Sequence, residues 1–280
     1  MRAWQKQVKV KGLAIHTVLI ALGIVWVYPF VWMLFSSFKT NTELIASGIK
    51  LLPEAPQWDN YNRAWTEANF SGYFQNTVII TVATVVIVVL MCALTGYALG
   101  RVQFPGRKLF VIVITATMFM PKGYTILPIY MTIKYMGLLN SLPGVILAES
   151  SGAHVLFILL FMSYFYKLPN ELEESAEMDG AGFLRTFRTV MLPLSKPMIA
   201  TTAIMQFIWT WNSFFVPLIF TMNNPDLRTL AVGMYAFVGE HSVDWTGMAA
   251  AAVISIMPII AVFVAFQRFF IEGISGSVKG

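Results

Sequence analysis

Long runs without a single charged side chain constrain this chain more than any other feature. Four such runs are found in the sequence, at 12–38, 68–100, 197–225 and 245–267. Each is long enough to cross the hydrocarbon core of a bilayer as a helix, which needs about 20 mostly apolar residues. Only a helix or a closed barrel satisfies the backbone polar groups there. The runs therefore predict membrane-spanning helices.

Composition excludes an ordinary soluble fold. Hydrophobic residues make up 57% of the chain and charged residues 12%, against about 25% charged residues in a typical soluble domain. The net charge of +5 comes from basic residues gathered in a few loops, which indicates membrane topology and not nucleic-acid binding. The single cysteine, Cys92, lies inside an apolar run and has no partner for an internal disulfide.

Two further segments are weaker candidates for spanning helices. The run 109–127 is broken by Pro121 and Lys122 near its end, and 143–166 carries Glu149 and His154. With these two included, we predict one all-α transmembrane domain over 1–280 with six spans. The predicted spans are 12–38, 73–99, 109–127, 143–166, 198–222 and 245–268.

The N-terminal run is interpreted as a retained first span and not as a signal peptide. Basic residues precede it, as in a signal peptide, but the run is longer than a signal's apolar core of about 7–15 residues and no small-residue cleavage site follows it. Most lysines and arginines fall in the N-tail, the 101–108 loop, the 167–197 loop and the C-tail. The positive-inside rule then predicts that both termini are cytoplasmic.

The longest and most charged cytoplasmic segment is the loop 167–197. Asn170 followed by Glu173 is typical of a capping box at a helix start, and Gly180 favours a helix end because glycine tolerates the left-handed conformation. A second short amphipathic stretch then begins at Phe183. We predict two short helices that lie flat at the membrane surface. Such an element could dock into a partner groove, or it could be a solvated loop on the headgroups.

A motif inside this loop favours the docking interpretation. A Glu-Ser-Ala triplet is followed after three residues by a glycine and after nine more by Val-x-Leu-Pro; the residues are Glu174, Ser175, Ala176, Gly180, Val190, Leu192 and Pro193. This spacing resembles the EAA loop of ABC importer permeases, with serine and valine in place of alanine and isoleucine. The flanking Met178-Asp179-Gly180-Ala181 is similar to the carbohydrate branch of that family.

The resemblance extends over nearly the whole chain. It rests on short pieces that are each similar to the six-span, smaller permease of maltose-type transporters: Tyr28-Pro29-Phe30, Ser36-Ser37-Phe38-Lys39, Asn60-Tyr61, Tyr97-Ala98-Leu99, Phe104-Pro105-Gly106-Arg107, Leu127-Pro128, Gly137-Leu138-Leu139-Asn140, Trp211-Asn212 and the tail 273–280. Lys122 departs from the family pattern, where an uncharged residue is expected.

The resemblance implies a set of partners and roles. The loop would form a coupling helix that docks on a cytoplasmic ATPase dimer, beside a second permease subunit, while an extracytoplasmic sugar-binding protein delivers the solute. The implied coupling residues are Glu174, Ser175, Ala176, Asp179, Gly180, Leu192 and Pro193. The resemblance thus implies a sugar or oligosaccharide importer subunit that is itself no enzyme and carries no cofactor.

Polar residues inside the fifth predicted span are candidates for the translocation path. Gln206, Thr210, Trp211 and Asn212 combine amide and aromatic groups of the kind that suit sugar rings, and polar groups within a membrane are costly unless they have a use. The alternative is that Asn212 hydrogen-bonds a neighbouring helix as structural glue.

Other chemistries find little support in the sequence. The glycines lack the Gly-Lys-Ser/Thr ending of a phosphate loop, and His16, His154 and His241 lack metal-ligand spacing. A permease for a different solute class remains open as an alternative, as does a stand-alone channel or an ion-coupled carrier. An ion-coupled carrier usually needs ionisable groups at mid-membrane depth, and only Lys122 and Glu149 come near.

Overall fold

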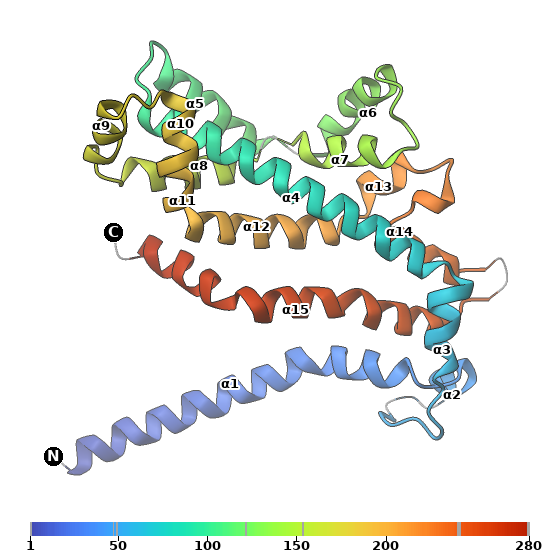
Figure 1. The fold of residues 1–280 in the computed structure, drawn as a ribbon. Helices are drawn as coiled ribbons and strands as arrows, with labels where there is room; N and C mark the ends of the chain where they lie inside the picture. The colour runs from blue at the N-terminus through green and yellow to red at the C-terminus, as the bar shows by residue number, and fades with distance from the viewer. Residues whose placement is uncertain are drawn as a thin grey trace. The chain divides into compact units, whose positions relative to one another are not determined.

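Helices make up most of the computed structural model, which describes residues 2–46, 48, 50–120, 122–152, 154–239 and 242–278 (Figure 1). The described residues contain no β-strand, only an isolated bridge between Val238 and Val243. The predicted all-α class is therefore confirmed for this part of the chain. His241 and the last two residues of the tail motif, Lys279 and Gly280, lie outside the described residues.

Three helices are continuous and long enough to cross a membrane. They are α1 (Arg2–Ser36), α4 (Phe70–Arg101) and α15 (Trp245–Val278). Helices α4 and α15 contain the predicted spans 73–99 and 245–268, whereas α1 ends two residues before the predicted span 12–38 does. Pro29 and Pro258 lie inside α1 and α15 without ending them, as is common in transmembrane helices, where neighbouring groups satisfy the freed carbonyl.

The third and fourth predicted spans are bent helix pairs. The third predicted span, 109–127, lies within a longer pair made of α5 (Arg107–Ala116) and η2 (Thr117–Phe119), followed by η3 (Lys122–Thr125) and α6 (Ile126–Tyr135). The pair turns by 101° between Phe119 and Gly123 and ends at Tyr135, so the predicted end at 127 falls near the start of α6. The fourth consists of α7 (Leu142–Ser150) and α8 (Val155–Tyr166), bent by 58°. Counting each pair as one span gives up to five spans among the described residues by length and composition.

The fifth predicted span, 198–222, is also interrupted. Helix α12 (Lys196–Trp211) ends before Asn212, and the short α13 (Phe215–Phe220) follows. Pro217 explains the position of the break, because its ring clashes with the carbonyl of residue 213 in a continuous helix and it has no N–H to donate there. A charge-free run does not reveal such a break, which is why the sequence predicted one helix.

The chain forms two compact units, and the first comprises Met1–Phe70 and Met234–Met257. Besides α1 and the start of α15 it contains α2 (Asn41–Ala46), α3 (Asp59–Asn62), the π-helical turn η1 (Arg63–Glu67) and η6 (Met234–Phe237). The buried Asn60 amide donates to the carbonyls of Ser37 and Lys39, both at 2.8 Å, and the Ser37 hydroxyl lies 2.7 Å from that of Tyr61. Two of the sequence motifs are thus joined here.

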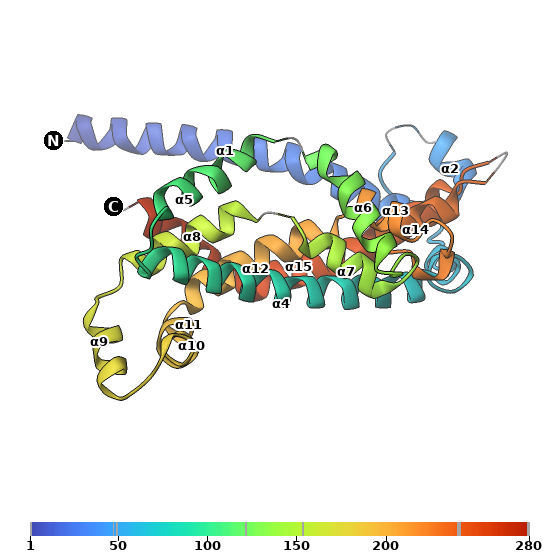
Figure 2. The ribbon, with the colours of Figure 1, turned by 90° about the horizontal axis from the view of Figure 1, so that it is seen from above.

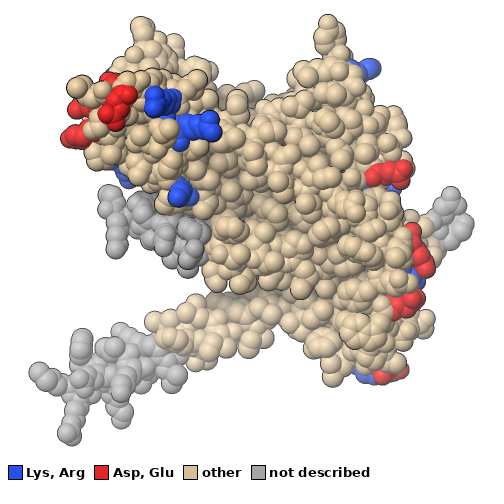
Figure 3. Space-filling view, viewed as in Figure 1, with Lys and Arg blue, Asp and Glu red and all other residues tan. Residues whose placement is uncertain are grey.

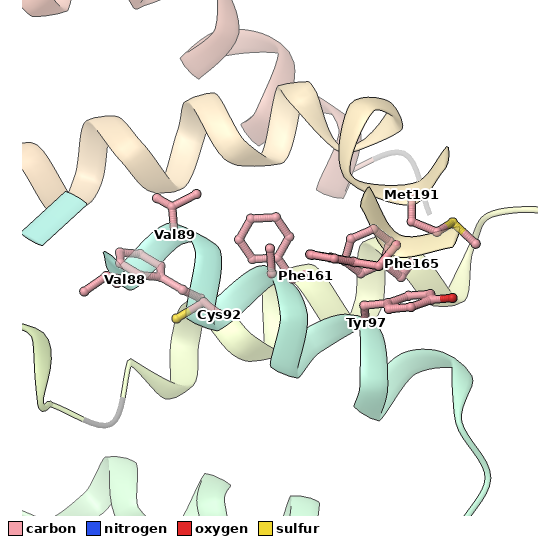
Figure 4. Close-up of a cluster of buried hydrophobic side chains, with 10 residues drawn as sticks. Val88, Val89, Cys92, Tyr97, Phe161, Phe165 and Met191 are labelled. Carbon is pink, nitrogen blue, oxygen red and sulfur yellow. The ribbon is translucent and has the colours of Figure 1, made fainter. Parts of the chain in front are cut away.

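The second unit comprises Ser71–Gly233 and Pro258–Gly280, and its main core joins α4, α8 and the segment before α12. Phe157, Phe161 and Phe165 project from one face of α8 and are completely buried against α4. Figure 4 shows two of these rings beside Cys92, Tyr97 and Met191.

Two glycines set the distance between α4 and α8. A Cβ added at Gly96 would lie 2.5 Å from Phe161 Cβ, and one at Gly100 would lie 3.0 Å from the Met162 carbonyl oxygen. Small residues four apart allow helix backbones to approach closely in a membrane protein. Gly96 and Gly100 therefore serve close helix packing.

The other end of the second unit is held by a smaller core. Ile80 of α4 packs with Ile133, Val145 and Phe220 from α6, α7 and α13. The connection after α13 contains η5 (Pro225–Leu227) and α14 (Leu230–Gly233). Asn76 of α4 holds this connection by donating to the carbonyls of Asp226 and Arg228 at 2.7 and 3.0 Å. Helix α4 therefore anchors both ends of the unit.

Candidate functional site

The predicted first helix of the charged loop is present as α9 (Glu171–Met178). Gly180 follows it with φ +74°, the left-handed conformation expected from the sequence. The Gly180 N–H donates to the Glu177 carbonyl and the Ala181 N–H to the Ala176 carbonyl, both at 2.9 Å. These two bonds form a Schellman motif, which fixes the direction of the chain as it leaves the helix.

The predicted capping box at the start of α9 is wrong. Asn170 has helical backbone angles and its side chain makes no capping hydrogen bond; its Oδ1 instead accepts from the Arg101 guanidinium of α4. Glu173, the other predicted member, accepts from the Tyr97 hydroxyl of the same helix. Partners brought by tertiary structure have displaced the local bonds that the sequence pattern favours.

The second helix of the loop is longer than predicted. It runs through α10 (Phe183–Thr186), the π-helical turn η4 (Phe187–Met191) and α11 (Leu192–Leu194), ending just before α12. Phe187 and Met191 point into the main core and are buried. Arg185 and Arg188 are exposed, but Phe183 and Leu184 are exposed as well, at 42% and 66%, so of the apolar residues expected at the start of this stretch only Phe187 is buried.

Most of the predicted coupling residues lie on an open surface. Ala176 is buried, Leu192 is half-buried, and the remaining five are exposed: Glu174, Ser175, Asp179, Gly180 and Pro193. Met178 beside them is 89% exposed. In Figure 3, acidic and basic side chains gather next to one another over α9 and α10. We name this charged surface, with its very exposed methionine, the knob. It comprises residues 171–188.

Tyr97 and Arg101 of α4, for which the sequence predicted no role, hold the knob in place. The Tyr97 hydroxyl donates to Glu173 Oε1 at 2.7 Å, and Arg101 Nε lies 3.2 Å from Glu173 Oε2. The rings of Phe183 and Phe187 stack on Tyr97 with centroids 4.8 and 5.4 Å away. Figures 1 and 2 both show α9, α10 and α11 gathered beside the C-terminal end of α4.

The signal for these two residues was present but ambiguous. Tyr97 lies in the Tyr97-Ala98-Leu99 piece of the resemblance, and Arg101 counts toward the positive-inside pattern of the 101–108 loop. Neither pattern indicates a contact with a segment that follows about 70 residues later, so only the structure could assign it.

The predicted path residues are not gathered at one surface. Gln206, Thr210 and Trp211 are buried while Asn212 is exposed. The Gln206 amide donates to the Thr210 hydroxyl at 2.9 Å, and its buried Oε1 has no hydrogen-bond partner within the described part of the chain. Asn212 donates to the Ile208 carbonyl of its own helix, at 2.8 Å, and so does not act as glue to another helix through this bond.

The described residues offer no group of three or more histidine, cysteine, aspartate or glutamate side chains that could hold a metal ion. Glu149 lies at the end of α7 and accepts a hydrogen bond from the Ser213 hydroxyl in the break after α12. This bond ties the fourth and fifth predicted spans together at their helix breaks.

Several long apolar helices, with a charged two-helix knob between α8 and α12, define a multi-pass membrane component of a transport system. The family described as "Binding-protein-dependent transport system inner membrane component" matches residues 93–276, and this chain belongs to that family. The match begins within α4 before Tyr97 and Arg101, includes the whole knob, and ends inside α15.

Several relatives align over nearly the full length of this chain. The diacetylchitobiose uptake system permease protein NgcG of Streptomyces coelicolor is 36% identical over 94% of this chain and 86% of its own length. The trehalose/maltose transport system permease protein MalG of Thermococcus litoralis is 30% identical over 93% and 94%. A solved bacterial ABC transporter involved in the import of the acidic polysaccharide alginate has a chain that superposes with a TM-score of 0.82 at 25% identity, covering 94% of this chain and 97% of its own.

Proposed function

We propose that this chain is the permease subunit through which an ATP-driven importer takes up a sugar or an oligosaccharide. The observation that carries the proposal is the full-length similarity to permeases named for diacetylchitobiose, for trehalose and maltose, and for arabinooligosaccharides. Fold similarity alone would not carry it, since one fold can host many solutes.

The proposed complex follows from the family. It contains a second permease subunit, a cytoplasmic ATPase dimer that hydrolyses ATP, and an extracytoplasmic sugar-binding protein, all placed around this chain in the membrane lipid. In this arrangement the chain has six spans and both termini in the cytoplasm, with α12 and α13 together crossing as the fifth span.

The knob is the proposed coupling element. Its first helix ends in a fixed Schellman turn and presents Glu174 and Met178 on the exposed side. A short rigid helix with an apolar anchor and a charged rim suits a groove on an ATPase, because little conformational entropy is lost when it docks. The proposal assigns docking to Glu174, Ser175, Asp179 and Gly180, with Leu192 and Pro193 leading into α12.

The translocation path is a separate part of the proposal. Gln206 is 2% exposed yet retains an amide oxygen with no bond partner in the described structure. A buried amide of this kind costs free energy unless a water, a solute or another subunit uses it. We propose that Gln206, Thr210 and Trp211 of α12 and Asn212 directly after it lie along the translocation path of the assembled importer, where the Gln206 oxygen can bind a water or the solute.

The test is uptake by the assembled complex in proteoliposomes. The chain is co-purified with its second permease subunit, the ATPase and the binding protein, and ATP is enclosed in the vesicles. Radiolabelled diacetylchitobiose, trehalose, maltose and arabinotriose are then offered outside. We expect uptake of at least one of these sugars that requires both ATP and the binding protein.

Controls separate the alternatives. Vesicles with the chain alone should take up none of the four sugars, and dissipating ion gradients with ionophores should leave ATP-driven uptake unchanged. Uptake by the chain alone, or uptake that disappears with the ionophores, would favour a stand-alone carrier and contradict the proposal. Stimulation of ATP hydrolysis only by phosphate or amino acids would indicate another solute class.

A further inference from the structure

The middle of α9 is fastened to α4 by an almost buried ion pair. The side chains of Arg101 and Glu173 are 8% and 19% exposed, with Arg101 Nε 3.2 Å from Glu173 Oε2. The other carboxylate oxygen accepts from the Tyr97 hydroxyl at 2.7 Å. One turn of α4 thus supplies a hydroxyl donor to one carboxylate oxygen and a guanidinium charge beside the other.

Arg101 also fixes the chain that leads into α9. Its guanidinium donates to the Asn170 side chain and to the carbonyl of Leu168, and its remaining contact reaches the Pro169 carbonyl at 3.4 Å. The planar guanidinium can bind several acceptors at fixed angles, which an ammonium group on a flexible stem cannot do. The connection from α8 to α9 is thus held by a side chain of α4.

The second helix of the knob contacts the same turn of α4. Phe183 and Phe187 stack on the Tyr97 ring at interplanar angles of 21° and 25°. Tyr97 thus binds α9 through its hydroxyl and α10 through its ring, so both halves of the knob are fixed to one residue. We name Tyr97, Arg101 and Glu173 the α4 clamp.

The clamp lies on the part of α4 that packs most closely against α8. Gly96 and Gly100 flank Tyr97 and bring α4 into close backbone contact with α8. Helix α8 packs against Phe187 of the knob in the main core and donates one hydrogen bond to the segment after the knob, from the Tyr164 hydroxyl to the Leu194 carbonyl at 2.7 Å. A displacement of the knob would therefore act on α4 and, directly and through the glycine contact, on α8.

We infer that Tyr97 and Arg101 are positioning residues that make the knob and α4 move as one rigid body, so that work done on the knob enters the transmembrane helices through α4. This inference rests on the proposed function, in which an ATPase moves the knob. It differs from docking, because Glu173 is turned toward α4 and the docking residue Glu174 is exposed.

The first test measures rigidity and needs no transported solute. Spin labels are placed at Glu171→Cys on α9, which is not among the docking residues, and at Met91→Cys on α4, both exposed positions, in a Cys92→Ala background within the purified complex. Pulsed electron resonance should give one narrow distance distribution. We expect Arg101→Gln and Glu173→Gln to broaden it, and Lys108→Gln, an exposed basic residue nearby that lacks these contacts, to leave it narrow.

The second test measures transmission as the number of sugar molecules imported per ATP hydrolysed. Using the panel sugar that the wild-type complex imports fastest, we expect Arg101→Gln to lower this ratio by about fivefold or more, a typical coupling effect. ATP hydrolysis should continue. Arg101→Lys should restore part of the ratio, and Arg101→Gln combined with Glu173→Gln should be no worse than either alone, because both remove the same contact.

The outcomes separate the inference from the proposed function. A wild-type complex that imports no sugar would defeat the proposed function, whereas a narrow distance distribution and a normal ratio in Arg101→Gln would overturn the clamp alone. If Arg101→Gln fails to assemble, Tyr97→Phe decides, since it removes only the hydroxyl bond and keeps the stacked ring. A normal ratio and a narrow distribution in Tyr97→Phe would then reject the inference.

Discussion

At the residue scale, Asp244 shows how one carboxylate can organise a helix start. Its Oδ1 accepts from the Gly247 N–H at 3.0 Å and from the Asn41 amide at 2.9 Å, and its Oδ2 pairs with Arg63 at 2.9 Å. The first bond is an N-cap for α15. Although burial alone raises the pKa of Asp244, these hydrogen bonds and the Arg63 charge lower it below its ordinary value.

This pKa shift makes a prediction about stability. We expect Asp244→Ala to destabilise the protein by about 0.5–2 kcal/mol, the range for loss of an N-cap side chain. A lowered folded-state pKa means that the contribution is fully present above the unfolded pKa, near 3.8, and is lost as the pH falls through the lower folded pKa. In thermal melts from pH 7 to 3, followed by tryptophan fluorescence, the difference between the variant and the wild type should therefore stay constant down to about pH 3.8 and begin to narrow below it.

Asp59 supplies the matched control for this prediction. Its carboxylate lies 3.7 Å from the same arginine but is 71% exposed, and exposed pairs contribute little. Asp59→Ala should leave the melting temperature almost unchanged at every pH. An equal loss in both variants would show that the charge on Arg63, and not the cap, carries the effect.

Gly96 is the residue at which helix packing can be tested most directly. An added Cβ would lie 2.5 Å from Phe161 Cβ and 2.9 Å from the Met162 nitrogen, so α4 and α8 would have to separate. We expect Gly96→Ala to cost roughly 1–3 kcal/mol, as overpacking does, and to lower the melting temperature of the detergent-solubilised complex.

Gly23 provides the comparison, because it lies inside α1 with no atom of the described structure within 4 Å of its added Cβ. Gly23→Ala should be neutral or slightly stabilising, since alanine is the better helix former. Equal melting temperatures for the two variants would contradict the close contact between α4 and α8.

At the element scale, the turn after α9 isolates backbone conformation from side-chain contacts. Gly180 has φ +74° and Gly182 has φ −80°, and neither has a neighbour within 4 Å of an added Cβ. Gly180→Ala should therefore cost about 1–2 kcal/mol from left-handed strain, while Gly182→Ala should cost less. Hydrogen exchange of the peptide 171–182 should quicken only in the first variant.

The same pair of variants tests the coupling role. Binding-protein-stimulated ATP hydrolysis should fall in Gly180→Ala and stay near the wild-type rate in Gly182→Ala. Faster exchange with unchanged stimulation would mean that the turn is structural only. Loss of stimulation in both would point to contact with the partner surface rather than to the shape of the turn.

The elements also show what could be predicted from the sequence. Uninterrupted apolar runs correctly placed α1, α4 and α15, because nothing in those runs opposes a helix. Gly180 was correctly placed at the helix end, because the left-handed conformation that ends a helix is a local property of glycine. The break before Phe215 was missed although Pro217 marks it, since a span was assigned from charge alone. The role of Asn170 was missed because Arg101, distant in sequence, outcompetes the local cap.

At the scale of the whole molecule, the open question is which ends of the helices face the cytoplasm. The proposed topology places the knob inside and the connection around η5 outside. The buried Cys92 is the only cysteine in the chain, so a Cys92→Ala background allows single reporter cysteines. Asn60 is unsuitable as a reporter because it is buried and bonded, but its neighbour Asp59 is exposed.

In intact cells, a membrane-impermeant maleimide should therefore label Asp59→Cys and Asn224→Cys, and should label Arg185→Cys only after the membrane is opened. This pattern follows if α1, with its basic N-terminal flank, starts in the cytoplasm and the number of crossings before residue 185 is even. Labelling of Arg185→Cys in intact cells would reverse the orientation and remove the knob from the reach of any cytoplasmic ATPase. Protection of Asn224→Cys alone would instead show that α12 and α13 do not together cross the bilayer, leaving the knob inside but changing the count of spans.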